Sequence, residues 1–152
     1  MCEGGSSGAV RFDDYETLVG PVLRTGSTVR ISRMKLYKNN HGILGIKIVY
    51  MIVDKNGKSN KHERAHKSKG VSFLTSKKSI NYSEEDSPKW IEGRYNSYIT
   101  QLKIVGKNES LLEAGRPIGK HLIIKPTKES VIIAIAGSIG DRLCNIKAYY
   151  SH

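Results

Sequence analysis

The sequence predicts an all-β fold, and three observations lead to that prediction. Apolar and β-branched residues recur in short runs that alternate with polar residues, which is the rhythm of half-buried strands. Residues that favour turns separate these runs at intervals of ~8–12 residues. No stretch of about ten residues combines a helical apolar period with helix caps. These features are typical of a sandwich, a barrel or a prism, and they do not choose among the three.

The first clear element is a hairpin. Residues 29–37 nearly alternate between apolar and polar, with a break between Ile31 and Met34 that predicts a bulge or bend. Residues 43–53 are β-branched and too few for most helices. The segment 39–42 lies between the two runs, and its Asn and Gly residues tolerate positive φ, so we expect a turn there. Residues 54–57 give a second turn signal of the same kind.

Residues 55–69 differ from the rest of the chain. They hold six Lys and Arg, two His and a single acid, and Ala65 is their only apolar residue. Because this segment has no apolar face to bury, we expect an exposed loop or a long hairpin end. Its cations are candidates for anion binding, and the alternative is a solvated charge run without a ligand. The candidates are Lys55, Lys58, Lys61, Arg64, Lys67 and Lys69.

Strands resume after this basic segment, separated by turn residues. We expect them at 71–75, 89–92, 98–105, 121–125, 131–136 and 143–150. Nothing after the Gly/Ser-rich opening reads as a linker or a low-complexity segment. The sequence therefore predicts a flexible tail over 1–7 and a single domain over 8–152.

The composition of the chain says more about its possible ligands than about its fold. The net charge of +11 predicts attraction to polyanions such as nucleic acid, anionic headgroups and sulfated glycans. The basic segment contains no aromatic residue for stacking on bases, so we expect only nonspecific binding of nucleic acid. No apolar run approaches the ~20 residues of a transmembrane helix. The N-terminus lacks the pattern of a signal peptide, which leaves the cytoplasm and the mature form of a secreted protein as alternatives.

Two features bear on cysteine and metal chemistry. Cys2 and Cys144 exclude a disulfide-dense scaffold and do not argue for a bridge between them. Residues 62–66 match the H-E-x-x-H pattern, in which two His on a packed helix bind zinc and the Glu is a general base. The Lys/Ser-rich flanks give such a helix no apolar face, and no other catalytic set is present. We expect no metal site, no cofactor and no enzymatic activity.

Three stretches together resemble the jacalin-related lectins. Residues 8–14, GAVRFDD, look like the family's glycine-rich opening followed by an aromatic residue and two Asp. Residues 94–104, RYNSYITQLKI, are similar to the strand pair that follows the family's "SG-aromatic" segment. Residues 137–149 resemble the C-terminal signature G-x-x-G-x-x-L-D-x-I-x-x-Y, and this piece is the most specific. The order and spacing of all three fit across nearly the whole chain.

The resemblance implies a β-prism I fold, with three four-stranded Greek-key sheets around a pseudo-threefold axis. It also implies a lectin that holds a sugar at one apex. The family uses backbone groups of the N-terminal loop and of the C-terminal signature, together with an Asp carboxylate. Carried over by motif, these positions are Gly8, Gly140, Asp141, Arg142 and Cys144, with Arg94 and Tyr95 as a candidate extension.

The chain departs from the family at Cys144, which stands where the family has Asp. A thiol is a poor acceptor, and each lost charge-assisted bond is worth about 1.5–3 kcal/mol. Asp141 and Arg142 place charges nearby. We therefore expect a carbohydrate-binding module that favours anionic ligands, such as sulfated glycans or phosphoinositides. The alternative is a structural or protein-interaction module with a decayed sugar site, and self-association into a homo-oligomer stays open.

Overall fold

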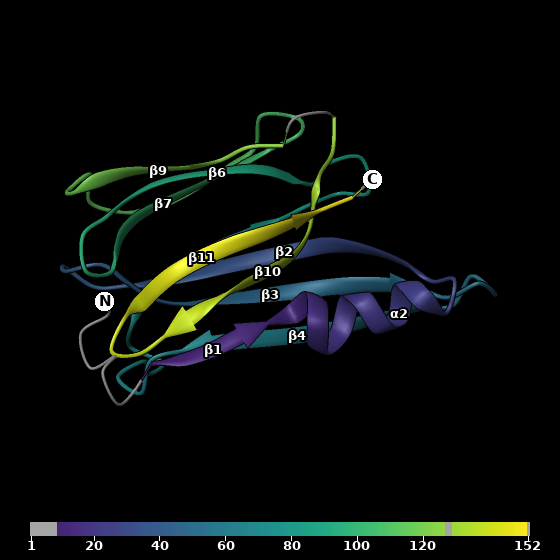
Figure 1. The fold of residues 1–152 in the computed structure, drawn as a ribbon, viewed down its shortest axis with the longest axis horizontal. Coiled ribbons are helices and arrows are strands. Elements are labelled where there is room, and N and C mark those ends of the chain that lie inside the picture. Colours follow the sequence, from purple (N-terminus) through teal and green to yellow (C-terminus); the bar gives the residue numbers. More distant parts are fainter. Residues whose placement is uncertain (1–8, 127–128, 152) are drawn as a thin grey trace.

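The computed structural model describes residues 9–126 and 129–151, and most of them lie in three antiparallel sheets (Figure 1). The first sheet has the strand order β1-β10-β11, with β1 at Val10–Asp13, β10 at Ile132–Ile139 and β11 at Leu143–Tyr150. The second has the order β4-β3-β2-β5, with β2 at Thr28–Lys38, β3 at Ile43–Val53, β4 at Ser59–Lys67 and β5 at Ser76–Asn81. The third has the order β8-β7-β6-β9, with β6 at Pro88–Tyr95, β7 at Ile99–Gly106, β8 at Leu111–Gly115 and β9 at Lys120–Ile124.

The second and third sheets share one Greek-key pattern. In each, three consecutive strands form hairpins and a fourth strand returns to lie beside the first. The first sheet closes the prism by pairing the N-terminal β1 with the C-terminal hairpin β10–β11. The fold is therefore the predicted β-prism. The first sheet has three strands within the described residues, where the resemblance implied four.

Register shifts repeat from sheet to sheet and mark the pseudo-threefold relation. The predicted bulge is present, because the β2–β3 register shifts between Ile31 and Arg33. The β6–β7 hairpin shifts between Pro88 and Trp90, and the β10–β11 hairpin has a corresponding shift early in β10. Each hairpin shifts again near its turn. Bulges increase the local twist of a strand pair, which helps each sheet to curve around the shared core.

The core lies between the three sheets, and each sheet contributes fully buried side chains to it. Strands with one face toward the core alternate buried and outward residues, as the burial along β8 and the second half of β7 illustrates. Isoleucine is the commonest of these core residues, and its β-branched side chain packs well on a pleated sheet. Representative core residues are Ile31, Met34, Leu36, Ile48, Ile91, Leu102, Ile104, Ile132, Ile135 and Leu143.

A short helical segment follows β1, and the sequence analysis did not predict it (Figure 1). It consists of a π-helical turn, η1, at Tyr15–Val19 and a helix, α2, at Gly20–Arg24. The N–H of Gly20 bonds to the carbonyl of Tyr15, and the following Pro21 lies in the first turn of α2, where no N–H is required. The segment is too short and irregular to show a helical period. No helix in the described part of the chain is long and apolar enough to cross a membrane.

The structure decides between the two alternatives for the basic segment 55–69 and contradicts one other prediction for the second sheet. The segment is the end of a long hairpin rather than a loop, because Ser59–Lys67 forms β4 and pairs with β3 from end to end. An edge strand needs a partner on one side only, so backbone bonds to the apolar β3 hold it despite its polar side chains. The strand expected at 71–75 is instead part of the loop between β4 and β5, and the pairing with β2 begins only at Ser76.

A buried polar cluster ties the end of β1 to the second sheet. Asp14 is only 1% exposed, and its carboxylate accepts a hydrogen bond of 2.7 Å from the Tyr50 hydroxyl. The His66 Nε2 atom lies 2.8 Å from the other oxygen of Asp14, and the Phe12 ring stacks on the His66 ring. Burial, reinforced by the charge of Asp14, raises the pKa of Tyr50 far above its usual value, so its hydroxyl stays protonated and donates.

Candidate functional site

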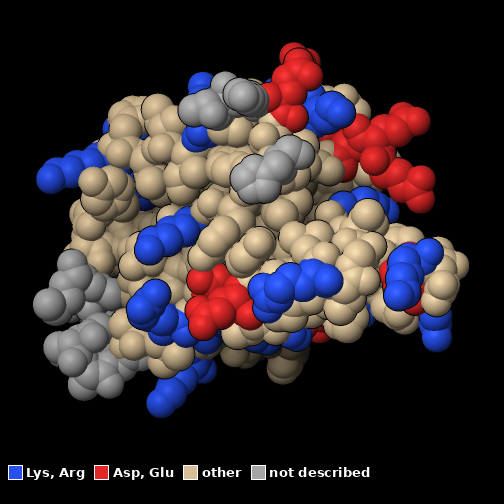
Figure 2. Space-filling model, turned by 45° about the vertical axis from the view of Figure 1, so that its right-hand side comes forward, with Lys and Arg blue, Asp and Glu red and all other residues tan. Residues whose placement is uncertain are grey.

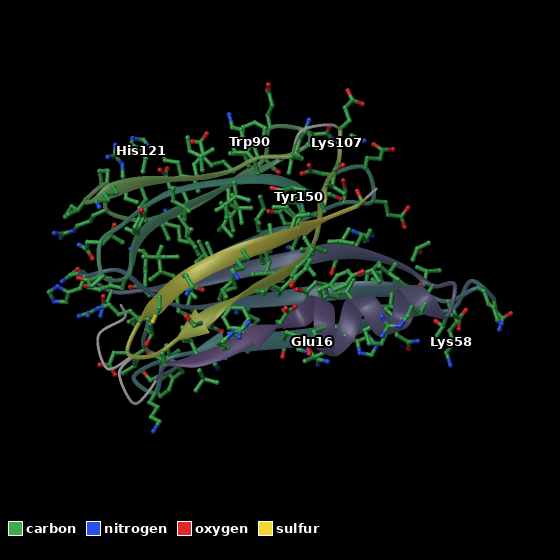
Figure 3. The ribbon with its side chains drawn as sticks, viewed as in Figure 1. Glu16, Lys58, Trp90, Lys107, His121 and Tyr150 are labelled. Carbon is green, nitrogen blue, oxygen red and sulfur yellow. The ribbon has the colours of Figure 1, made fainter. Side chains whose placement is uncertain are left out.

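Three hairpin turns meet at one end of the prism. They are residues 39–42 between β2 and β3, 96–98 between β6 and β7, and 140–142 between β10 and β11. Each turn is closed by a backbone hydrogen bond of 3.0 or 3.1 Å. The β4–β5 loop, 68–75, and the β8–β9 loop, 116–119, lie at the same end, because their flanking strands finish or begin there. We call this end the apex; Figure 3 labels His121 there and Lys58 and Lys107 at the opposite end.

Tyr98 joins the three turns to one another. A Cβ atom added to Gly42 would lie only 2.9 Å from the Tyr98 ring, so the first turn packs directly against the second. The guanidinium carbon of Arg142, in the third turn, lies over the same ring, 4.3 Å from its centroid. This cation–π contact fixes Arg142 against the protein. The apex is therefore a packed surface in which turns distant in sequence hold each other in place.

A groove of about 570 Å³ opens at the apex between the first and third sheets. Its floor is aliphatic, from residues such as Ile99 and Ile146. Its polar lining consists of aromatic rings, hydroxyls and amides, and no Lys, Arg, Asp or Glu lines it within the described residues. Rings offer flat apolar faces, while hydroxyls and amides both donate and accept hydrogen bonds. The polar lining residues are Tyr95, Asn96, Ser97, His121, Ser138 and Asn145, and Cys144 lies among them.

The β8–β9 loop holds Tyr95 in position beside the groove. Gly119 has a positive φ of 108°, and a Cβ atom there would lie 2.3 Å from the Tyr95 carbonyl oxygen, so only glycine fits. The guanidinium of Arg94 donates a hydrogen bond of 3.2 Å to the Gly119 carbonyl. Arg94 therefore holds the loop in place, and Tyr95, which is 37% exposed, lines the groove.

The structure brings only part of the family-derived site to the groove. Cys144 and Tyr95 line it, whereas Gly140 and Asp141 lie in the neighbouring turn and Arg142 packs on Tyr98. Cys144 is disulfide-bonded, so its sulfur offers neither the charge nor the acceptor strength of the family's carboxylate. The predicted Gly8 and the predicted tail over 1–7 lie outside the described residues.

Several groove residues were missed by the sequence analysis. His121 reaches the groove because β9 pairs with β6, which places His121 opposite Arg94. Ser138 and Asn145 lie opposite one another on β10 and β11. No spacing in the sequence links these three residues, since they come from different strands. Asn96 and Ser97 did carry a signal, because they are turn residues directly after Tyr95.

The six cations of residues 55–69 do not form one site. Lys55 and Lys58 lie in the β3–β4 turn. Figure 3 shows Lys58 at the end opposite the apex. Lys61 and Lys67 alternate with Arg64 along β4, so Arg64 lies on the other face of the strand. Lys69 lies in the β4–β5 loop at the apex. Pairing of β4 with β3 thus spreads these cations along the length of the prism.

The strand register gathers a different set of cations on the outer face of the second sheet. Lys35 of β2 pairs with Lys47 of β3, and Lys47 forms an ion pair of 2.7 Å with Glu63, the acid of this face. Burial, followed by the charges of Lys47, Arg33 and Lys77, lowers the pKa of Lys35. We call this surface the basic face, and it comprises Arg30, Arg33, Lys35, Lys47, Lys61, Lys67 and Lys77.

The H-E-x-x-H segment lies on β4 rather than on a helix. Four residues along a strand span ~13 Å, so His62 and His66 are too far apart to bind one zinc ion. His66 is engaged by Asp14 instead. Within the described residues, no group of His, Cys, Asp and Glu is placed to hold a metal ion.

Comparison with solved structures identifies the class of this fold. Jacalin in complex with melibiose aligns with a TM-score of 0.69 and 19% identity, covering 93% of this chain and 98% of jacalin. A galactose-specific lectin from Artocarpus hirsuta in complex with methyl-α-D-galactose aligns with a TM-score of 0.70 and 18% identity. The alignment covers 93% of this chain and 98% of the lectin. Artocarpin in complex with mannopentose aligns with a TM-score of 0.69 and 17% identity, and the alignment covers 96% of this chain and 92% of artocarpin. No family model and no curated protein matches the chain. The chain has the β-prism fold of the jacalin-related lectins.

Proposed function

We propose that this chain is a carbohydrate-binding module and that its glycan lies in the apex groove. The observation that carries the proposal is the groove lining, in which the Tyr95 ring stands beside the amides and hydroxyls of Asn96, Ser97 and Asn145. A sugar ring has apolar C–H faces and a rim of hydroxyls, so it matches such a lining. The similar solved structures are lectins, and their titles name bound sugars, which supports the same class of ligand here.

We further propose that the glycan is acidic, with sulfate groups as the favoured charge. The described lining of the groove carries no Lys, Arg, Asp or Glu, whereas the described residues of the apex as a whole are rich in cations. The described residues of the apex include one acid, Asp141. These residues are 9–11, 38–42, 67–78, 94–98, 116–121 and 140–142. Their cations are Arg11, Lys38, Lys67, Lys69, Lys77, Lys78, Arg94, Arg116, Lys120 and Arg142. Three of these cations pair with groove-lining residues across the sheets: Arg11 with Ser138, Arg94 with His121 and Lys120 with Tyr95. The sulfates of a sugar in the neutral groove would meet these cations first.

Binding without catalysis is part of this proposal. The groove lining consists of rings, amides, hydroxyls and aliphatic side chains. Glycoside cleavage normally requires two carboxyl groups across the bond, and the described lining residues supply none.

The test is a glycan array of neutral and sulfated glycans and phosphoinositide headgroups, at low and at physiological salt. Tyr95→Ala should weaken every array ligand at least about tenfold, because it removes the ring and its apolar contact. Lys120→Gln should weaken only sulfated ligands, since Lys120 pairs with Tyr95 at the rim and lies outside the groove lining. Phe73→Ser and Lys107→Gln are the matched controls, an exposed aromatic outside the groove and a cation at the opposite end.

Array binding that survives Tyr95→Ala at full strength would contradict the groove as the site. Selective binding of phosphoinositide headgroups would keep the site and replace the sulfated glycan by a phosphorylated polyol. If no ligand of the array is bound at either salt concentration, the alternative function is favoured, a protein-interaction module with a decayed sugar site.

A further inference from the structure

Two large apolar side chains project from the β4–β5 loop into solvent. Phe73 is 84% exposed and Leu74 is 80% exposed, which makes them the most exposed large apolar residues of the described chain. They are adjacent in sequence and lie at the apex, outside the groove lining. Isolated exposed apolar residues are ordinary on protein surfaces, but an exposed adjacent pair on a loop tip marks an interaction surface.

The loop holds this pair outward by its own hydrogen bonds. The N–H of Thr75 bonds to the carbonyl of Ser72 at 3.1 Å, so Phe73 and Leu74 occupy the two central positions of a turn. The Thr75 hydroxyl accepts from the N–H of Ser72, and the Ser72 hydroxyl accepts from the N–H of Leu74. Lys77 also donates to the Phe73 carbonyl, at 3.0 Å. The pair is therefore presented by an ordered turn.

Cations surround the apolar pair, and acids are absent from this part of the chain. Residues 67–78 contain Lys67, Lys69, Lys77 and Lys78 and neither Asp nor Glu. All four lysines are exposed. An apolar tip ringed by lysines has the composition of segments that lie in a membrane interface, where the apolar side chains enter the acyl boundary and the cations meet anionic headgroups.

We propose that the β4–β5 loop docks the protein on an anionic membrane surface, with Phe73 and Leu74 inserted at the headgroup boundary. A protein partner fits the surface less well, because a stable interface buries ~800 Å² on each side and a two-residue tip supplies far less. Insertion needs only the tip. Other exposed apolar residues, Val10 and Ile118, lie at the same end of the prism and would face the same surface. This proposal concerns a surface separate from the glycan groove and does not depend on it.

The experiment is co-sedimentation of the intact protein with phosphatidylcholine vesicles, with and without phosphatidylserine. We expect binding to the phosphatidylserine vesicles only. The double variant Phe73→Ser, Leu74→Ser should weaken binding more than tenfold, whereas Leu111→Ser should not change it. Leu111 is a matched control because it is 53% exposed and begins β8 at the opposite end. Both variants alter exposed side chains, and circular dichroism checks that each is folded.

Two further measurements separate insertion from simple charge attraction. Lys69→Gln and Lys78→Gln should each weaken binding about fivefold, and Lys107→Gln should have no effect. With Trp90→Phe as background, Phe73→Trp should give an indole emission that shifts to the blue on phosphatidylserine vesicles. Absence of vesicle binding would overturn the proposal. The proposal would also be overturned if binding depended on the lysines but was unchanged in the Phe73/Leu74 double variant, with no shift of the indole emission. Tyr95→Ala should keep vesicle binding, so failure here and failure of the glycan site are distinguishable.

Discussion

At the scale of single residues, the buried Asp14, directly after β1, links the first sheet to the second through Tyr50 and His66. Tyr50, fully buried, donates to its carboxylate and also accepts a hydrogen bond of 3.2 Å from the N–H of Ile135 in β10. One hydroxyl thus satisfies a buried charge and a buried backbone donor. Leaving such groups without a partner is strongly unfavourable in a dry interior.

Tyr50→Phe should lower the free energy of unfolding by about 1–3 kcal/mol, because it leaves the Asp14 oxygen and the Ile135 N–H without this partner. Tyr82→Phe is the matched control. Tyr82 is 4% exposed, but its hydroxyl has only a weak contact of 4.0 Å with the Met34 sulfur, so its loss should lower stability by less than ~1 kcal/mol. Urea unfolding of the three proteins measures both changes, and equal losses in the two variants would contradict this account of the cluster.

At the scale of elements, the basic face of the second sheet concentrates charge of one sign. Lys35 and Lys47 lie opposite one another on β2 and β3, and like charges directly opposite on a sheet are destabilising. The lowered pKa of Lys35 agrees with this, since burial and its cationic neighbours disfavour the charged form. Glu63 offsets part of the repulsion through its ion pair with Lys47.

The fold should therefore gain stability as salt rises from low to physiological concentration, because screening weakens repulsion between exposed cations. Lys35→Gln should raise the free energy of unfolding at low salt by about 0.2–1 kcal/mol and reduce the gain that salt gives. Thermal unfolding at two salt concentrations measures both effects, with Lys107→Gln as the control. A wild-type protein that loses stability with added salt would argue against repulsion on this face.

The elements also differ in how well the sequence predicted them. The hairpin β2–β3 was predictable with its bulge, since alternation of apolar residues and an Asn/Gly turn mark each part. β4 was not, because its side chains are polar and its stability comes from backbone pairing with β3. Residues 71–75 were predicted as a strand because Val71, Phe73 and Leu74 form an apolar run. In the structure they belong to a loop, and Phe73 and Leu74 are exposed. An apolar run predicts burial, and the exposed pair Phe73 and Leu74 is an exception to that rule.

The candidate site was less predictable than the fold. The C-terminal signature located the apex and Cys144, and the motif at residues 94–104 located Tyr95. The remaining groove residues depend on which strands of the first and third sheets lie side by side. His121, for example, reaches the groove only through the pairing of β9 with β6. Such placement follows from topology, which no local pattern of residues encodes.

At the scale of the whole molecule, the two ends of the prism differ in charge. Within the described residues, the apex carries ten cations against one acid, Asp141. The described residues of the opposite end include the acids Asp54, Glu84, Glu85, Asp86, Glu109 and Glu129 and the cations Arg24, Lys55, Lys58, Lys89, Lys107 and Lys125, so the two signs balance there. Figure 2 shows acidic side chains gathered at its upper right. This polarity should orient the molecule with its apex toward an anionic surface or an acidic glycan.

Carbohydrate binding in the apex groove can be tested by a map of amide chemical shifts in the isotope-labelled protein, titrated with a sulfated disaccharide at physiological salt. Shifts should concentrate at the groove, in Tyr95, Asn96, Ser97, His121, Ser138 and Asn145. Residues of the basic face and of the β3–β4 turn should change little. Shifts confined to the basic face, or no saturable shift at the groove, would contradict the claim that the apex groove is the carbohydrate site.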